Sequence, residues 1–139
     1  MSSLLEKLES LFGSSDTGSI NGLEYEFNPI PADVEVVQVV FKEREELPIY
    51  LTQSDSQMMC ICYLWAETEI IPEKRTEMLE LMLDMNIPIP LSSFGRIGSR
   101  YTIFGALSLN SSAESIGKEL TVLSDNALDA IEAMSEYLN

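Results

Sequence analysis

The chain has 139 residues, a mass of 15.5 kDa and a formal net charge of −15, from 23 acidic and 8 basic residues. This charge repels phosphate backbones and anionic lipids, so it argues against nucleic acid as a partner and against direct membrane insertion. The absence of histidine excludes Ser-His-Asp triads and histidine-ligated metals. With 45% apolar residues and a common domain length, residues 1–139 are expected to form one domain.

The first segment, MSSLLEKLESLFG, lacks the basic start of a secretory signal peptide and has helical apolar spacing. It predicts a helix from Ser3 to Phe12, with a capping box of Ser3 and Glu6 and an end at Gly13. The segment from Gly13 to Gly22 predicts a flexible loop. Because no apolar run is long enough to cross a bilayer, we expect a soluble, cytoplasmic protein.

Strands are predicted next, because the period of the pattern changes to two or to continuous β-forming residues. The expected strands are Leu23–Asn28, Val34–Phe41, Pro48–Thr52 and Gln57–Ala66. The last two are joined by Gln53-Ser54-Asp55-Ser56, a natural hairpin turn. Cys60 and Cys62 lie in the last strand, and we expect them to be buried free thiols.

A second helix is expected from Pro72 to Asn86, because proline suits a first helical turn and Pro88 and Pro90 prevent continuation. Its expected buried face is apolar and rich in methionine: Met78, Leu79, Met82, Leu83 and Met85. A hairpin follows, with strands at Leu91–Ile97 and Tyr101–Leu109 and a turn at Gly98-Ser99.

The last predicted helix runs from Ser112 to Leu138, with a capping box of Ser111 and Glu114. Gly117 or the stretch from Ser124 to Asn126 could bend or break it. The whole order, α-β-β-β-α-β-β-α, predicts an α+β fold with a single, mainly antiparallel sheet of about five to six strands and a long C-terminal helix.

The second hairpin is the basic part of this acidic chain. Residues 91–110 carry +2 from Arg96 and Arg100, and no acidic residue occurs between Asp84 and Glu114. One interpretation is an anion-binding or partner-binding site of Arg96 and Arg100 with Phe94, Tyr101 and Trp65. The other is that the arginines only offset the surrounding acids. Trp65 also fits a place at the edge of the core.

Other patterns also have two interpretations. The methionines could line an adaptable binding groove or fill the core. Acidic pairs such as Asp125 and Asp129 could bind a divalent ion, although a solvated helix face explains them as well. Gly95, Gly98 and Gly105 fit turns and bulges better than a phosphate loop, since neither a GK[ST] motif nor a helix follows them. No catalytic or metal-ligating set emerges from these residues, and no cofactor is expected.

The segment NIPIPLSSFGRIGSRYTIFGALS, from Asn86 to Ser108, resembles the signature stretch of the YjfI-like family of uncharacterised bacterial proteins. Pro90 to Phe94 is the most specific part, and the resemblance extends over the preceding helix and the strand that ends at Trp65. Family members are commonly encoded beside a phage-shock-protein-A-like coiled-coil protein, which acts at stressed membranes. The element order also resembles the fold of class I type III secretion chaperones and YbjN-like proteins, which are small, acidic and often dimeric.

These observations favour a non-enzymatic, chaperone- or adaptor-like module that binds another protein, with the coiled-coil membrane-stress protein as its expected partner. A homodimer is compatible with the resemblance. The alternative is a small sensor or enzyme for an anionic ligand, with a pocket that faces both Arg96 and Arg100.

Overall fold

The structure is a computed structural model that describes residues 3–13 and 19–139, and the following elements are those of the described residues. The helices are α1 (Leu4–Phe12), α2 (Arg75–Met85) and α3 (Ala113–Ala133). The strands are β1 (Ser19–Ile20), β2 (Leu23–Ile30), β3 (Val36–Phe41), β4 (Ile49–Gln53), β5 (Met58–Ala66), β6 (Ser93–Ile97) and β7 (Arg100–Leu107). Short 3-10 turns occupy Lys42–Arg44, Glu67–Glu69, Pro72–Lys74 and Ser135–Tyr137.

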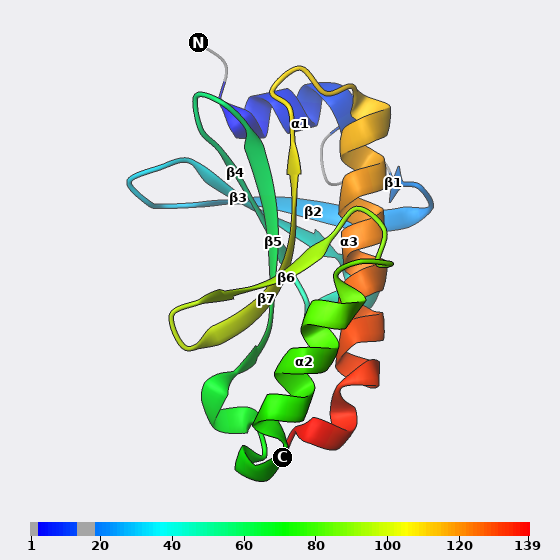
Figure 1. Cartoon of the computed structure of the whole chain (residues 1–139). Coiled ribbons are helices and arrows are strands. Elements are labelled where there is room, and N and C mark those ends of the chain that lie inside the picture. Colours follow the sequence, from blue (N-terminus) through cyan, green and yellow to red (C-terminus); the bar gives the residue numbers. More distant parts are fainter. Residues whose placement is uncertain (1–2, 14–18) are drawn as a thin grey trace.

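The described strands form one antiparallel sheet in the order β1-β2-β3-β4-β5-β7-β6, as Figure 1 shows. This confirms the predicted fold class. The sheet has seven strands because residues 19–20, in the segment expected to be a loop, pair with β2. Residues 14–18 of that segment lie outside the described residues.

The helices lie on one face of the twisted sheet, with α3 along its length, α1 across one end and α2 beside α3 (Figure 1). Side chains therefore alternate between a covered and an uncovered face. In β5, Met58, Cys60 and Cys62 are buried beneath the helices. Ile61 and Tyr63, which point to the uncovered face, remain partly exposed.

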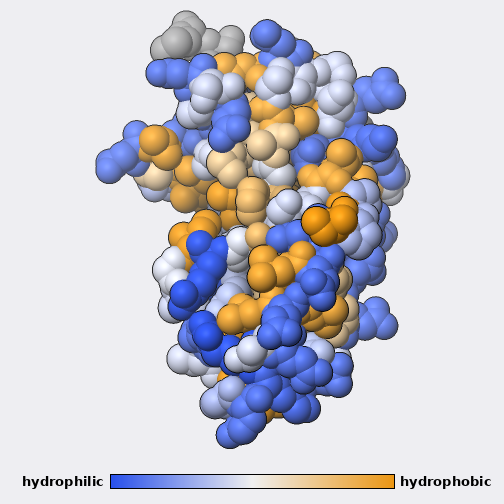
Figure 2. Space-filling model, in the orientation of Figure 1, coloured by the Kyte–Doolittle hydropathy of each residue, from blue (hydrophilic) through white to orange (hydrophobic). Residues whose placement is uncertain are grey.

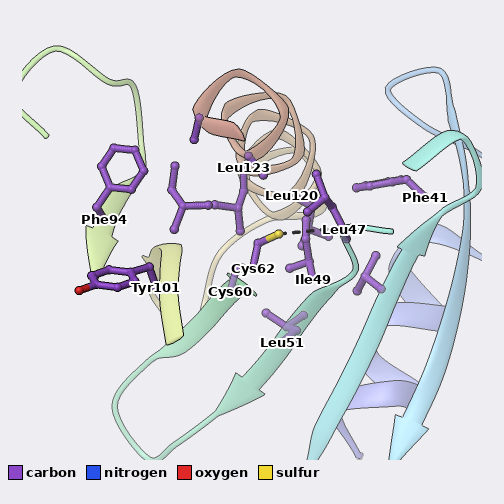
Figure 3. Close-up of a cluster of buried hydrophobic side chains, with 14 of the residues drawn as sticks. Phe41, Leu47, Ile49, Leu51, Cys60, Cys62, Phe94, Tyr101, Leu120 and Leu123 are labelled. Carbon is purple, nitrogen blue, oxygen red and sulfur yellow. Dashed lines mark hydrogen bonds between the residues drawn. The ribbon is translucent and has the colours of Figure 1, made fainter. Parts of the chain in front are cut away.

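The hydrophobic core lies between α3 and the central strands, where Leu120 and Leu123 face β4 and β5 (Figure 3). Cys60 and Cys62 are buried free thiols there, as predicted, and the Cys62 sulfur lies 3.9 Å from the carbonyl oxygen of Leu47. Burial raises the pKa of both thiols, that of Cys62 to about 12.

The N-terminal helix ends at Phe12 as predicted, and the Ser3 half of the predicted capping box is formed. Ser3 caps α1 by accepting a hydrogen bond from the backbone N–H of Glu6, and Gly13 ends the helix with a φ of 90°. The remaining helices differ in detail. The segment Pro72–Lys74 is a 3-10 turn rather than the start of α2, although its proline does occupy a first-turn position.

The C-terminal helix is shorter than predicted but unbroken, because a 3-10 turn replaces its last residues and Ser112, not Ser111, is its N-cap. The residues at which a bend or break was expected contact other segments of the chain instead. Gly117 leaves room for Ile20 and Phe12, and Asn126 donates hydrogen bonds to the carbonyl of Pro90 and to Ser92. Both residues thus make contacts with other segments of the chain, and these take the place of local side-chain bonds that could interrupt the helix.

Candidate functional site

A groove of about 310 Å³ lies between α2 and the β6–β7 hairpin. We call it the α2–β6 groove. Its lining is mainly apolar, and Arg75, Asn86 and Arg96 supply its polar groups: Arg75, Leu79, Met82, Leu83, Asn86, Phe94, Gly95, Arg96 and Tyr101. Asn86 fixes one wall, because its side-chain oxygen accepts a 2.7 Å hydrogen bond from the backbone N–H of Phe94.

Three large hydrophobic side chains are exposed, one in the lining of the groove and two in the segment that follows α2. Leu83 is 68% exposed, Ile87 87% and Leu91 52%. The prediction that Leu83 is buried is therefore wrong, since α2 turns Met78 and Met82 toward the core instead. Figure 2 shows hydrophobic surface over α2 and beside it, bordered by hydrophilic residues. Contiguous apolar surface rimmed by polar groups is typical of a binding site.

One end of the groove carries a network centred on Glu67. Its carboxylate accepts two hydrogen bonds from Arg75, at 2.8 and 3.1 Å, one of 2.8 Å from the Tyr101 hydroxyl and one of 3.2 Å from Arg96. The Arg75 bonds, and then the Tyr101 bond, lower the pKa of Glu67. Burial raises the pKa of Tyr101, and its bond to Glu67 adds to that shift. Two guanidinium groups share one carboxylate, so this end of the groove keeps one unit of positive charge.

The two arginines of the basic hairpin do not form one site. Arg96 is paired with Tyr101 across the hairpin, and its guanidinium lies 5.6 Å from that ring, on the helix-covered side. Arg100 precedes Tyr101 on β7 and therefore points to the opposite face, where it stacks 4.4 Å from the ring centre of Tyr63. The expected pocket that faces both arginines is thus not formed, because the pleat separates them.

The other candidate residues have different environments. Phe94 and Tyr101 line the α2–β6 groove with Arg96. Trp65 is buried in the core, so it is a core residue, and its ring lies 6.3 Å from that of Tyr101. Its indole Nε1 has no hydrogen-bond partner among the described residues.

The acidic residues do not gather into a metal site in the part of the chain that the structure describes. Asp125 forms an ion pair with Arg44 at 2.6 Å, which fixes the turn after β3 onto α3. None of the described helices is both long enough and apolar enough to span a membrane.

Two features escaped the sequence prediction. Glu67 and Arg75 lie on different elements with no local pattern, so only the folded chain brings them together. The exposed hydrophobic residues had no periodic signal, because α2 ends at Met85 and Ile87 and Leu91 lie in the connection to β6.

The fold and the groove define a two-layer α+β protein with helices on one face of an antiparallel sheet. Residues 4–138 match the family described as "Uncharacterized protein conserved in bacteria (DUF2170)". The chain therefore belongs to this family of uncharacterised bacterial proteins.

Two curated relatives support the YjfI-like resemblance. Each is called "Uncharacterized protein YjfI", one from Escherichia coli strain K12 and one from Escherichia coli O157:H7. Both are 51% identical over 53 aligned residues, in a match that covers 35% of this chain. The chain spans 40% of the length of these curated relatives in the match.

The fold also occurs in a solved structure, that of an uncharacterised protein from Methanothermobacter thermautotrophicus. It has a TM-score of 0.65 and 13% identity, and the match covers 98% of this chain and 97% of that chain. At this identity the match shows a shared fold alone. The likeness to class I type III secretion chaperones stays a prediction.

Proposed function

We propose that the protein is a non-enzymatic binding module that captures an amphipathic helix of another protein in the α2–β6 groove. The observation that carries this proposal is the apolar groove with exposed Leu83 in its lining, followed in the chain by exposed Ile87 and Leu91. Helix-in-groove recognition uses such a surface, because apolar residues at i, i+3, i+4 and i+7 of a partner can enter it.

The charges around the groove favour a basic partner helix. Glu80 and Asp84 are exposed on α2 next to Leu83, and the chain as a whole carries −15. Such a field accelerates the approach of a basic segment and disfavours acidic competitors. At the other end, Arg75 and Arg96 share Glu67, so an acidic residue or carboxyl end of the partner helix would find a guanidinium there.

The proposed partner is a phage-shock-protein-A-like coiled-coil protein. Coiled-coil segments present apolar a and d positions in the spacing that the groove accepts, with charged residues beside them. The choice of this particular partner rests on the family resemblance. The groove supports only the kind of ligand, an amphipathic helix.

Fluorescence anisotropy of a labelled coiled-coil segment from the host's phage-shock-protein-A-like protein tests the proposal. A basic amphipathic model helix with leucines at i, i+3, i+4 and i+7 serves as the second probe. We expect Leu83→Glu to weaken binding at least about tenfold, because it places a charge in the apolar contact. Val34→Glu is the matched control: it puts the same charge on a similarly exposed hydrophobic residue, 60% exposed, in the β2–β3 connection.

The outcomes separate the partner from the function. Binding of both probes with loss in Leu83→Glu alone supports the whole proposal. Binding of the model helix but not of the coiled-coil segment would remove the proposed partner and keep the groove. If neither probe binds, or if Val34→Glu weakens binding as much as Leu83→Glu, the proposed function is wrong.

A further inference from the structure

The face of the sheet opposite the helices is the second large surface without cover among the described elements (Figure 1). Its central side chains are aromatic, aliphatic or uncharged and polar, and nearly all are partly exposed: Gln38, Val40, Tyr50, Thr52, Met59, Ile61, Tyr63, Thr102 and Phe104. The rings of Tyr50 and Tyr63 meet edge to face at 5.8 Å. We call this surface the open sheet face.

Charge is distributed unevenly over the open sheet face. Although 22% of the chain is charged, the outward residues of β3, β4 and β5 carry no charge. The outward acids Glu24 and Glu26 lie on β2, toward one edge of the sheet, and the outward base Arg100 lies on β7, toward the other. A surface with an uncharged centre and opposite charges at its two sides can be complementary to itself.

The strand register places these opposite charges at the same level. One row of paired residues crosses the sheet through Phe27, Val39, Ile49, Cys62 and Ile103. Glu24 and Arg100 are each three positions from that row, in the same direction, because β2 and β7 run parallel with three strands between them.

We infer that the open sheet face binds a second copy of this chain. The two copies are related by a two-fold axis that lies between their sheets and is parallel to β4. Rotation about this axis lays β2 of one copy over β7 of its partner, so that Glu24 and Arg100 meet twice. The same rotation lays β3 of one copy over β5 of the other, which brings Val40 toward Tyr63 of the opposite sheet. Two sheets stacked in this way pack with their strands nearly aligned.

A second copy fits this face better than an unrelated protein. Two chains of −15 repel each other wherever acidic surfaces meet, but the centre of the open sheet face carries no acid. A hollow of about 360 Å³ beside Phe104 and Ile97 offers room for a protruding partner side chain. The α2–β6 groove lies on the helix-covered side of the sheet and meets this hollow at the edge strand β6, where both are lined by Phe94, Gly95 and Arg96. Positions 24 and 100 line neither of them, so variants there test this inference separately from the proposed function.

Charge reversal tests the inference with two single variants, Arg100→Glu and Glu24→Arg. Both positions are exposed, and circular dichroism with thermal unfolding verifies that each variant folds. The readout is the mass in solution by light scattering, at matched concentrations. We expect the wild type to have twice the 15.5 kDa of one chain, and each variant alone to shift toward the single-chain mass, because like charges then meet at both contacts.

An equimolar mixture of the two variants is the decisive arm. In a mixed pair the introduced glutamate faces the introduced arginine, and the native Arg100 faces the native Glu24, so the double mass returns. Only an arrangement in which position 100 of one copy faces position 24 of the other gives this rescue. A wild type with single-chain mass at all concentrations would overturn the inference. So would a double mass that Arg100→Glu leaves unchanged, or a mixture of variants that stays at the single-chain mass.

Discussion

The contact between Gly105 and Glu119 gives a sharp test of how α3 lies on the sheet. A methyl group at Gly105 would overlap Oε2 of Glu119, and would lie 2.9 Å from its Cδ and 3.0 Å from the carbonyl oxygen of Leu91. Glu119 is only 4% exposed, so its carboxyl group cannot swing into solvent without moving α3. Gly105→Ala therefore forces either the helix or β7 to shift.

The expected cost is about 2 kcal/mol, within the ~1–3 kcal/mol that overpacked core positions lose. For a domain of this size that loss lowers the melting temperature by about 6 °C, taking ~3 °C per kcal/mol. Glu119→Ala removes the obstructing atoms, so Gly105→Ala should cost at least ~1 kcal/mol less in that background. The Leu91 carbonyl remains nearby, so a part of the cost persists.

Urea unfolding of the wild type, the two single variants and the double variant measures this coupling. The prediction is a coupling free energy of ~1 kcal/mol or more in the direction of rescue. Costs that add within ~0.5 kcal/mol would show that Glu119 does not occupy the space beside Gly105.

Three further predictions concern the buried and capping residues. Burial raises the pKa of Glu119, so the folded state holds its proton more tightly than the unfolded state, and wild-type stability falls as the pH rises above about 4.5 through the folded pKa. Denaturant unfolding should therefore show Glu119→Gln gaining on the wild type from pH 5 to 8, and a constant difference would contradict this. Ser112→Ala should cost ~1 kcal/mol as a lost N-cap, against a few tenths for Ser111→Ala, with the reverse ranking counting against the observed cap. Cys60 and Cys62 should resist a thiol reagent at pH 8 until the protein is unfolded, because both are buried with raised pKa values, and rapid reaction of the native protein would show an open core.

Alternation and β-forming residues predicted most of the sheet, because strands such as β2, β3 and β4 bury every second residue. Tyr25 and Phe27 on β2 illustrate this, as do Ile49 and Leu51 on β4. The strand positions and the antiparallel pairing followed from those patterns and from short turns. The two-residue β1, which pairs with the neighbouring β2, could not be predicted, since a pattern of two residues carries no period.

The candidate site was predicted only in part. The hairpin with Phe94, Arg96 and Tyr101 does line the groove, but Arg100 lies on the opposite face because consecutive strand residues alternate. Leu83, near the end of α2, shows a second reason why sequence prediction fell short. Leu83 has the hydrophobicity of a core residue, and only the packing direction of α2 places it on the surface.

We propose that the α2–β6 groove receives an amphipathic helix. Titration of the isotopically labelled protein with the basic amphipathic helix, followed residue by residue through backbone amide NMR shifts, tests it most directly. We expect saturable shifts confined to α2, residues 86–92 and β6, with little change in β3 and β4. Shifts concentrated on β3 and β4, or spread evenly over the acidic surface without saturation, would contradict it.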